Sequence, residues 1–395
     1  MSIISKRFDE VFNLSLGRTP SRGEKSYWGG DNTWVSIADM SCGKYISHTK
    51  EGITHTAIKE TGIPIVHKGT VIMSFKLSIG KVCITDTDLY TNEAIMAFSP
   101  KHPNTILPEF LYYYLQAYKW EGSTEVVLGF TLNKKTISNS IITYPSSLSE
   151  QQRIVDILDA EFEKIDRLRS NAELNLQHAK DLFQAALKKE LEPKEGWADN
   201  SIEEIAEIKG GKRVPKGYKL TTSPTSHPYI RVADFSDDGT VDLSDIHYVD
   251  DNVFKEIKRY TISPNDVYIS IAGTIGKSGI IPLELDGANL TENACKLVLK
   301  KGLLNRFVYY CTISDSFREQ AAKLTMQAAQ PKLALTRLAT IRIPVPPLSE
   351  QQTIISTLDD LNTKCKVLQD NYTKTIALCD DLKQALLRKA FNGEL

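Results

Sequence analysis

Hydrophobic residues recur in alternating steps of four and three along two stretches of the chain, 148–192 and 348–392. This period of 3.5 residues predicts a long helix with a single apolar stripe, as in a coiled coil. Proline disfavours helix in the residue before it, so we expect the helices to begin after Pro145 and after Pro347. Each helix would be roughly 60 Å long. A rod of that length must pack on something, and the other copy is the obvious candidate.

The expected seam between the two helices consists of the apolar residues selected by these steps. The interface residues that we predict are Ile154, Leu158, Ile165, Leu168, Leu182, Ile354, Leu358, Leu368, Leu382 and Leu386.

The two stretches are copies of one another. LSEQQRIVDILD at 148–159 returns as LSEQQTIISTLD at 348–359, an offset of 200 residues without a gap. DLFQAALKKEL at 181–191 realigns with DLKQALLRKAF at the same offset. An internal repeat of this length indicates one structural unit present twice. The chain is therefore expected to be a pseudo-dimer with two equivalent surfaces.

The segments between the helices carry short β-type runs, broken by turn residues, and each ends in a short aromatic helix. Their sequences are far less alike than those of the helices, but short matching sequence motifs appear in the same order. These are 17–20 with 211–215, 35–40 with 230–235, 79–81 with 275–277, and 110–113 with 307–310. The pattern predicts one α+β fold used twice, with a surface that has diverged.

We therefore divide the chain into four parts: an α+β domain at 1–147, a helical region at 148–195, a second α+β domain at 196–347 and a second helical region at 348–395. The predicted fold class is α+β, with two similar domains alternating with two long helices that pair as an antiparallel coiled coil.

The composition is that of an ordinary globular protein, with 41% hydrophobic and 25% charged residues and a net charge of −1. No apolar run is long enough to span a membrane, and the N-terminus does not have the pattern of a secretory signal. The six cysteines are scattered and form no CxxC pair, which favours the cytoplasm over an oxidising compartment. With so little excess charge, any nucleic-acid surface must be a local patch.

Recognisable catalytic motifs are missing from the sequence. GTIGKS at 273–278 has two residues between its glycines, whereas a phosphate-binding loop needs four, so a strand-connecting turn is the better interpretation. No amino-methyltransferase or restriction-nuclease motif is present, and the seven histidines lack ligand spacing. We predict no catalytic residue, no metal site and no cofactor in this chain.

Basic residues in the loops of the two domains are the remaining candidates for functional residues. Each alone has the simpler interpretation of a solvated surface charge, but as a set they suit contacts to DNA phosphates and base edges. Lysines such as Lys134, Lys135 and Lys277 suit phosphate, and arginines suit guanine. The candidate DNA-binding residues are Arg18, Arg22, Lys25, Lys76, Lys81, Lys134, Lys135, Lys212, Arg213, Lys216, Arg231, Lys277 and Lys332.

The whole pattern resembles the specificity (S) subunit of type I restriction–modification enzymes. The marks are the two LSEQQ helices alternating with two divergent domains, and the GRTP, IGK and aromatic-helix elements within those domains. The first domain departs from the second in lacking a counterpart of Gly196-Trp197, which leaves its start open.

The resemblance implies that each domain is a target recognition domain that reads one half of a bipartite, asymmetric sequence in double-stranded DNA. The helices would set the unread spacer and hold two methyltransferase (M) subunits. Adenine methylation and DNA cleavage would be carried out by partner subunits, including the restriction/translocase (R) subunits. S-adenosylmethionine, ATP and Mg would be bound by those partners, in a cytoplasmic complex.

Two other interpretations remain open. A coiled-coil adaptor that binds proteins and reads no DNA would explain the helices, but not two divergent copies of one domain. An enzyme that uses nucleotide or S-adenosylmethionine would need motifs that the sequence lacks.

Overall fold

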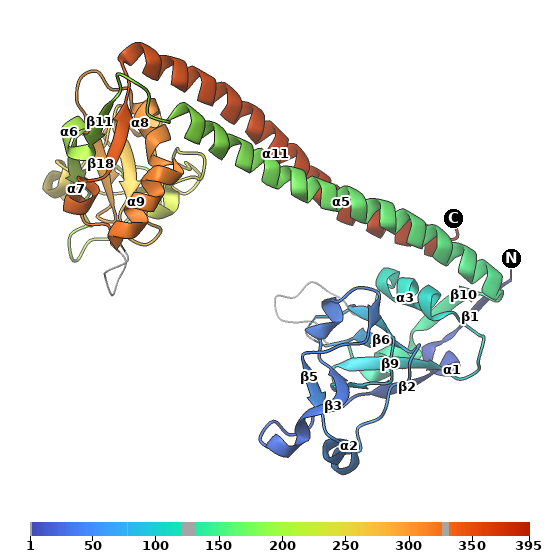
Figure 1. Ribbon diagram of the computed structural model, residues 1–395. Helices are drawn as coiled ribbons and strands as arrows, with labels where there is room; N and C mark the ends of the chain where they lie inside the picture. The colour runs from blue at the N-terminus through green and yellow to red at the C-terminus, as the bar shows by residue number, and fades with distance from the viewer. Residues whose placement is uncertain (1, 77, 121–131, 326–331) are drawn as a thin grey trace. The chain divides into compact units, whose positions relative to one another are not determined.

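The computed structural model describes residues 2–76, 78–120, 132–325 and 332–395 (Figure 1). The chain divides into two compact units. Unit 1 consists of Met1–Ala172 and Lys374–Leu395, and unit 2 of Glu173–Thr373. Each unit combines one α+β domain with parts of two long helices, α5 (Leu148–Glu190) and α11 (Leu348–Phe391). The predicted α+β class with two long helices is confirmed.

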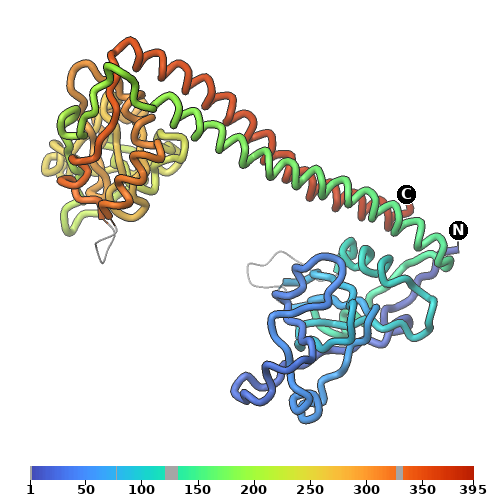
Figure 2. Tube along the Cα trace, in the orientation of Figure 1, coloured from blue at the N-terminus to red at the C-terminus, as the bar shows by residue number. Residues whose placement is uncertain are grey.

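The long helices pair antiparallel, as predicted, and Figure 2 traces them side by side. In unit 1, Asp166 forms an ion pair with Lys383, and Arg169 forms one with Asp380. Residue numbers therefore rise along one helix where they fall along the other. In unit 2, Leu187 near the end of α5 shares a core cluster with Leu358 near the start of α11. Within the described part of the chain, no helix is both long and apolar enough to cross a membrane.

The structure corrects the phase of the expected seam. Ile154, Leu158, Ile165, Ile354 and Leu358 are buried and Leu386 is half-buried. The other four predicted interface residues point largely to solvent, with exposed fractions of 50% for Leu168, 51% for Leu182, 39% for Leu368 and 47% for Leu382.

The physical reason for this shift is the aromatic helix of each domain. The half-buried side chains of α5 include Phe162, Leu176 and Phe183, and Phe183 directly follows the predicted seam residue Leu182. The Phe162 ring contacts the Tyr113 ring at 5.3 Å, and the Phe183 ring contacts the Tyr310 ring at 6.2 Å. The heptad pattern alone allows the leucines to be buried. Large aromatic side chains bury more apolar area, however, so their contacts fix the rotation of the helix.

The domain of unit 1 contains a five-stranded sheet in the order β2-β9-β6-β7-β4, a three-stranded sheet in the order β5-β3-β8 and the pair β1-β10. Its helix α3 (Pro108–Ala117) contacts β6 and β7. The remaining elements are β1 (Ile3–Arg7), α1 (Phe8–Val11), β2 (Phe12–Leu16), η1 (Lys25–Tyr27), β3 (Trp28–Val35), η2 (Asp39–Ser41), β4 (Tyr45–Ile46), β5 (Glu51–Ile53), α2 (His55–Thr61), β6 (Val71–Ser74), β7 (Val82–Thr85), β8 (Tyr90–Thr91), β9 (Ile95–Pro100), α4 (Lys134–Asn139) and β10 (Ile141–Pro145).

The domain of unit 2 repeats this plan with sheets β12-β18-β15-β16, β14-β13-β17 and β11-β19. Its helix α8 (Asn305–Thr312) contacts β15 and β16. The remaining elements are β11 (Ala198–Ser201), α6 (Ile202–Ile205), β12 (Ala206–Gly210), β13 (Pro228–Ile230), η3 (Val232–Asp234), β14 (His247–Tyr248), α7 (Asp251–Ile257), β15 (Val267–Ser270), β16 (Ser278–Gly279), η4 (Leu283–Leu285), β17 (Asn289–Leu290), β18 (Ala294–Leu299), α9 (Asp315–Thr325), α10 (Leu335–Leu338) and β19 (Arg342–Val345).

A buried glutamine joins each domain to its helix and explains the LSEQQ repeat. The Gln151 side chain is fully buried; it accepts from the Leu107 amide at 2.9 Å and donates to the Pro145 carbonyl at 2.9 Å. Gln351 makes the same bonds in unit 2, accepting from Leu304 at 3.0 Å and donating to Pro346 at 3.0 Å. The amide thus connects the end of the last strand, the entry of the aromatic helix and the first turn of the long helix.

Two turns further along each long helix, an aspartate strengthens this joint. Asp159 accepts hydrogen bonds from the Tyr113 hydroxyl and from the Lys44 ammonium, the latter at 2.7 Å. Asp359 accepts from the Tyr310 hydroxyl and from the Arg306 guanidinium, the latter at 2.8 Å. Burial and the bond to Asp159 raise the pKa of Tyr113.

Replacing Gln151 with alanine should lower the stability of unit 1 by about 2–4 kcal/mol, because the buried Leu107 amide and Pro145 carbonyl lose their partner. The measurement is the thermal or denaturant unfolding of the full chain. Gln152→Ala is the matched control, since Gln152 is exposed and its side chain bonds, among the described residues, only Asp156 on its own helix. Equal effects of the two substitutions would contradict the assigned role of Gln151.

Candidate nucleic-acid interface

The loop after the first sheet strand of each domain crosses directly over another turn of the backbone. In unit 1, the Arg18 amide donates to the Thr91 carbonyl at 2.8 Å, and a Cβ added to Gly17 would lie 1.9 Å from that oxygen. In unit 2, the Lys212 amide donates to the Leu290 carbonyl at 2.8 Å, and a Cβ on Gly211 would lie 2.0 Å from the Thr291 oxygen. Only glycine permits this approach, which explains the shared glycine of the GRTP and GKRVP motifs.

An aromatic side chain fixes the next peptide of this crossing loop. The Trp34 indole donates to the Arg18 carbonyl at 3.1 Å, and the Tyr229 hydroxyl donates to the Lys212 carbonyl at 2.8 Å. Both aromatic residues are buried and lie at matching positions of β3 and β13. The backbone of the loop is therefore held in the same way in both units, while its side chains differ.

A glutamate in the crossed turn accepts a hydrogen bond from the side chain of the second residue after the crossing glycine. Glu93 accepts from the Thr19 hydroxyl, and this bond lowers the pKa of Glu93. Glu292 accepts from Nε of Arg213. Burial opposes ionisation of Glu292, but the bonds from Arg213 and Thr291 outweigh it, so its pKa lies below the ordinary value. The same carboxylate position thus holds a hydroxyl in unit 1 and a guanidinium in unit 2.

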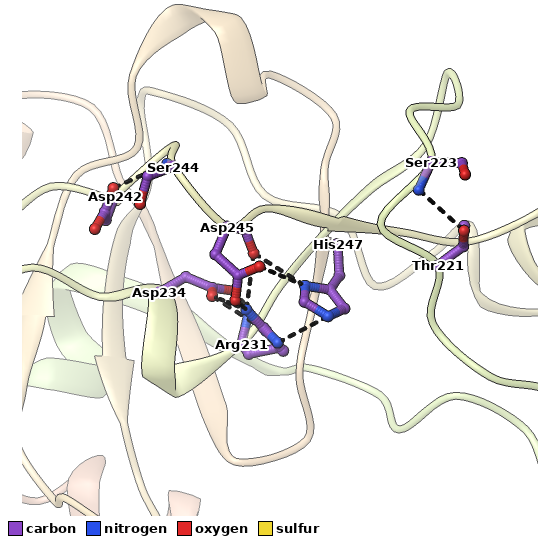
Figure 3. A network of polar contacts seen from close by, with 8 residues as sticks. All are labelled: Thr221, Ser223, Arg231, Asp234, Asp242, Ser244, Asp245 and His247. Carbon is purple, nitrogen blue, oxygen red and sulfur yellow. Dashed lines mark hydrogen bonds and ion pairs between the residues drawn. The ribbon is translucent and has the colours of Figure 1, made fainter. Parts of the chain in front are cut away.

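The turns after β3 and after β13 share the same backbone hydrogen bond to an aspartate but carry different side chains. Asp39 accepts from the Ser36 amide at 2.9 Å, and Asp234 accepts from the Arg231 amide at 2.6 Å. In unit 2 the arginine additionally donates to Asp234 through Nε and Nη2, to Asp245 at 3.0 Å and to His247 at 3.1 Å (Figure 3). Arg231 therefore links η3 to β14 inside the domain.

The IGK motifs form one type of strand-connecting turn, as predicted for GTIGKS. The Gly80 amide donates to the Ser74 carbonyl at 3.0 Å, and the Gly276 amide donates to the Ser270 carbonyl at 2.9 Å. Both glycines have positive φ, 87° and 85°. The two lysines bind within their own domains: Lys81 donates to Ser41 at 2.8 Å, and Lys277 forms an ion pair with Asp237 at 2.8 Å.

Arg22 is held at the edge of the smaller sheet of unit 1. Its two terminal nitrogens donate to Glu51 at 2.6 and 2.9 Å, and its guanidinium lies 3.9 Å from the centre of the Trp28 ring. The bond to Glu51 raises the pKa of Arg22.

The remaining candidates fall into two groups. Arg18 donates to the Thr61 carbonyl, Lys76 is half-buried against the Phe75 ring, and Lys212 faces the Tyr260 ring at 5.8 Å. The second group is exposed, and its side chains make no hydrogen bond or ion pair with any described residue: Lys25, Lys134, Lys135, Lys216 and Lys332.

Three of these exposed lysines border the IGK turns. Lys134 and Lys135 begin α4, just after Leu132, whose amide donates to the Phe75 carbonyl at 3.1 Å. Lys332 precedes Leu333, whose amide donates to the Ile271 carbonyl at 2.9 Å. The structure therefore places exposed lysines beside the same turn in both units, where they can meet a phosphate backbone.

Sequence reasoning found the cations of this surface but missed the carboxylates that hold them, namely Glu51, Asp234, Asp237 and Glu292, and it also missed Glu93, which accepts from Thr19. One signal was available, because Asn92-Glu93-Ala94 and Glu292-Asn293-Ala294 follow matching strands in both domains. Within the described ranges, no group of three or more histidine, cysteine, aspartate or glutamate residues could hold a metal ion.

A family model, the type I restriction modification DNA specificity domain, matches this chain twice, over residues 5–176 and 194–376. Among curated proteins, the chain is similar to the type I restriction enzyme MjaIX specificity subunit of Methanocaldococcus jannaschii. The two are 25% identical, and the alignment covers 99% of this chain and 93% of that protein.

Solved structures share the fold. A chain from a study of complex assembly and conformational transition of the type I R-M system superposes with a TM-score of 0.80 at 20% identity, covering 100% of this chain and 98% of that one. The HsdS subunit from Thermoanaerobacter tengcongensis gives a TM-score of 0.55 at 20% identity, with 100% and 97% covered.

Gly211→Ala should destabilise unit 2 by about 1–3 kcal/mol, because the new Cβ collides with the Thr291 and Leu290 carbonyls and the loop must move. Gly210→Ala is the matched control, since its Cβ would lie 3.5 Å from a flexible leucine side chain. Thermal unfolding of both variants measures the difference. If Gly211→Ala were as stable as Gly210→Ala, the loop would not be fixed by this crossing.

Proposed function

Because the chain belongs to the type I restriction modification DNA specificity family, we propose that it is the sequence-specific DNA-binding subunit of a type I restriction–modification complex. Each domain reads one half of a bipartite, asymmetric target in double-stranded DNA. The helices set the length of the unread spacer between the halves.

The observation that carries this proposal is a common backbone frame with different side chains at a matching position. The crossing loop presents Thr19 in unit 1 and Arg213 in unit 2. A hydroxyl and a guanidinium suit different base edges. Two copies of one frame with divergent side chains are what an asymmetric target requires.

The repeated helices support docking of two copies of one partner, the methyltransferase subunit. In unit 1 the exposed leucines Leu168 and Leu382 lie at facing levels of the helix pair, and in unit 2 Leu182 and Leu368 do the same. Exposed apolar side chains that form a contiguous patch mark protein-binding surfaces, and we propose that these leucines belong to such patches. This feature also suits an adaptor without DNA readout, but an adaptor gives no reason for two divergent domains.

The chain itself is proposed to be non-catalytic. Adenine methylation and DNA cleavage belong to the methyltransferase and restriction/translocase partners, which would bind S-adenosylmethionine, ATP and Mg. This division rests on the lack of catalytic motifs in the sequence and on relatives that are named specificity subunits.

Exchanging residues 1–145 for the equivalent segment of a relative should change one half of the methylated target and leave the other half unchanged. Each domain has its own core and its own glutamine joint, so the exchanged domain folds against the same helix. Sequencing of modified sites in cells that contain the methyltransferase partner measures the target. A change in both halves would contradict independent readout, and no methylated target at all in the parent complex would contradict the proposed function.

Lengthening both helices by one heptad, at turns that face each other, should lengthen the spacer. Seven residues add about 10 Å to a helix, which is the rise of about three base pairs. The same sequencing of modified sites should therefore give unchanged half-sites with a spacer longer by about three base pairs. Four alanine substitutions at exposed helix positions, without insertion, serve as the control. An unchanged spacer in the lengthened variant would show that the helices do not determine it.

A further inference from the structure

The arginines of the candidate interface differ in which edge of the guanidinium is already bound. Arg22 has both terminal nitrogens on Glu51. Arg231 uses Nε and Nη2 for Asp234 and Nη1 for His247 (Figure 3). These two side chains are occupied within the domain and have no terminal edge left for a base.

Arg213 is held differently. Glu292 accepts from its Nε, and neither terminal nitrogen makes a hydrogen bond with any residue that the structure describes. The Arg213 side chain is 77% exposed, whereas Glu292 is only 25% exposed and is itself held by the Thr291 hydroxyl at 3.0 Å. The carboxylate therefore fixes the direction of the side chain and leaves its two terminal nitrogens facing outward.

The backbone beneath Arg213 is also fixed before any ligand arrives. Gly211 crosses the turn that carries Glu292, the Lys212 amide donates to Leu290, and the Tyr229 hydroxyl holds the Lys212 carbonyl. Arg213, Tyr229 and Glu292 line one shallow concavity of unit 2. A side chain placed in this way loses little conformational entropy on binding.

We propose that Arg213 reads a guanine in the half-site bound by unit 2, and that Glu292 is the residue that positions it. The inference rests on the proposed function and deepens it. The two terminal nitrogens of an arginine match the adjacent O6 and N7 acceptors of guanine in the major groove. The Arg213–Glu292 pair carries no net charge, so it offers a phosphate less attraction than the exposed lysines do.

In unit 1 the equivalent position is occupied by Thr19, which bonds the equivalent carboxylate, Glu93. A single hydroxyl cannot make the bidentate guanine contact. The guanine requirement should therefore be specific to the half-site of unit 2.

The test uses the full complex with its methyltransferase partner and measures binding to a DNA library in which each position of the parent target is varied. Arg213→Ala should reduce the preference for guanine at one position of one half-site by roughly 5- to 150-fold, and leave the other half-site unchanged. Arg213→Lys should lower the same preference by a smaller factor, because lysine keeps the charge but not the planar, fixed pair of donors. Glu292→Gln should give a smaller loss at that same position.

Glu207→Gln is the matched control, because it removes the carboxylate of an exposed ion pair with Lys209 in the same domain. It should leave every position unchanged. Thermal unfolding of each complex separates a loss of readout from a loss of fold, and Arg213→Lys keeps the test independent of folding defects in the alanine variant.

If both Arg213→Ala and Arg213→Lys retained the parent preference at all positions, Arg213 would read no base and the inference would be wrong. The same holds if Arg213→Ala weakened all sequences equally. If Glu292→Gln matched the parent complex at every position, Glu292 would have no positioning role. A parent complex without any sequence preference would instead contradict the proposed function itself.

Discussion

The buried amide of one glutamine per domain, Gln151 or Gln351, is the interaction on which the arrangement of each unit depends. It connects three backbone segments that would otherwise bury unpaired polar groups: the end of the last strand, the entry of the aromatic helix and the first turn of the long helix. Because the aromatic helix is fixed in this way, its tyrosine reaches the aspartate two turns along the long helix. Together with the ring contacts of Phe162 and Phe183, this bond fixes the rotation of the long helices.

The joint between domain and helix uses the same helix residues in both copies, whereas other side chains of the domains differ. The glutamine and the aspartate with which each long helix binds its domain are the same in both copies, whereas the domain supplies different partners for the aspartate, Lys44 in one unit and Arg306 in the other. Backbone contacts carry most of the frame: the glycine crossing, the aromatic hydrogen bond to the loop and the aspartate at the turn recur in both units. Side chains attached to such a frame can change without loss of the fold, so one chain can carry two different surfaces.

Much of this was predictable from the sequence. The repeat predicted both long helices and their antiparallel pairing, because a heptad pattern and a repeated start are local properties. The choice between Leu168 and the flanking side of the helix was not local; it depends on Phe162 meeting an aromatic helix about fifty residues earlier in the chain. The same limit applies to the site. Cations are visible as residue types, but their carboxylates, such as Glu292 for Arg213, come from distant segments that only folding brings together.

The pairing of cations with carboxylates on the candidate interface has a kinetic consequence. Arg22, Arg213, Arg231 and Lys277 each share their charge with an acidic neighbour, so these four side chains add little to the attraction for a DNA backbone, which would rest on the exposed lysines. If the chain binds DNA as proposed, the paired cations would release few counterions on sequences that do not match, and they would favour fast dissociation from them. Long residence would occur only where base contacts are completed, so the time spent searching a genome is limited by many short encounters instead of a few prolonged ones.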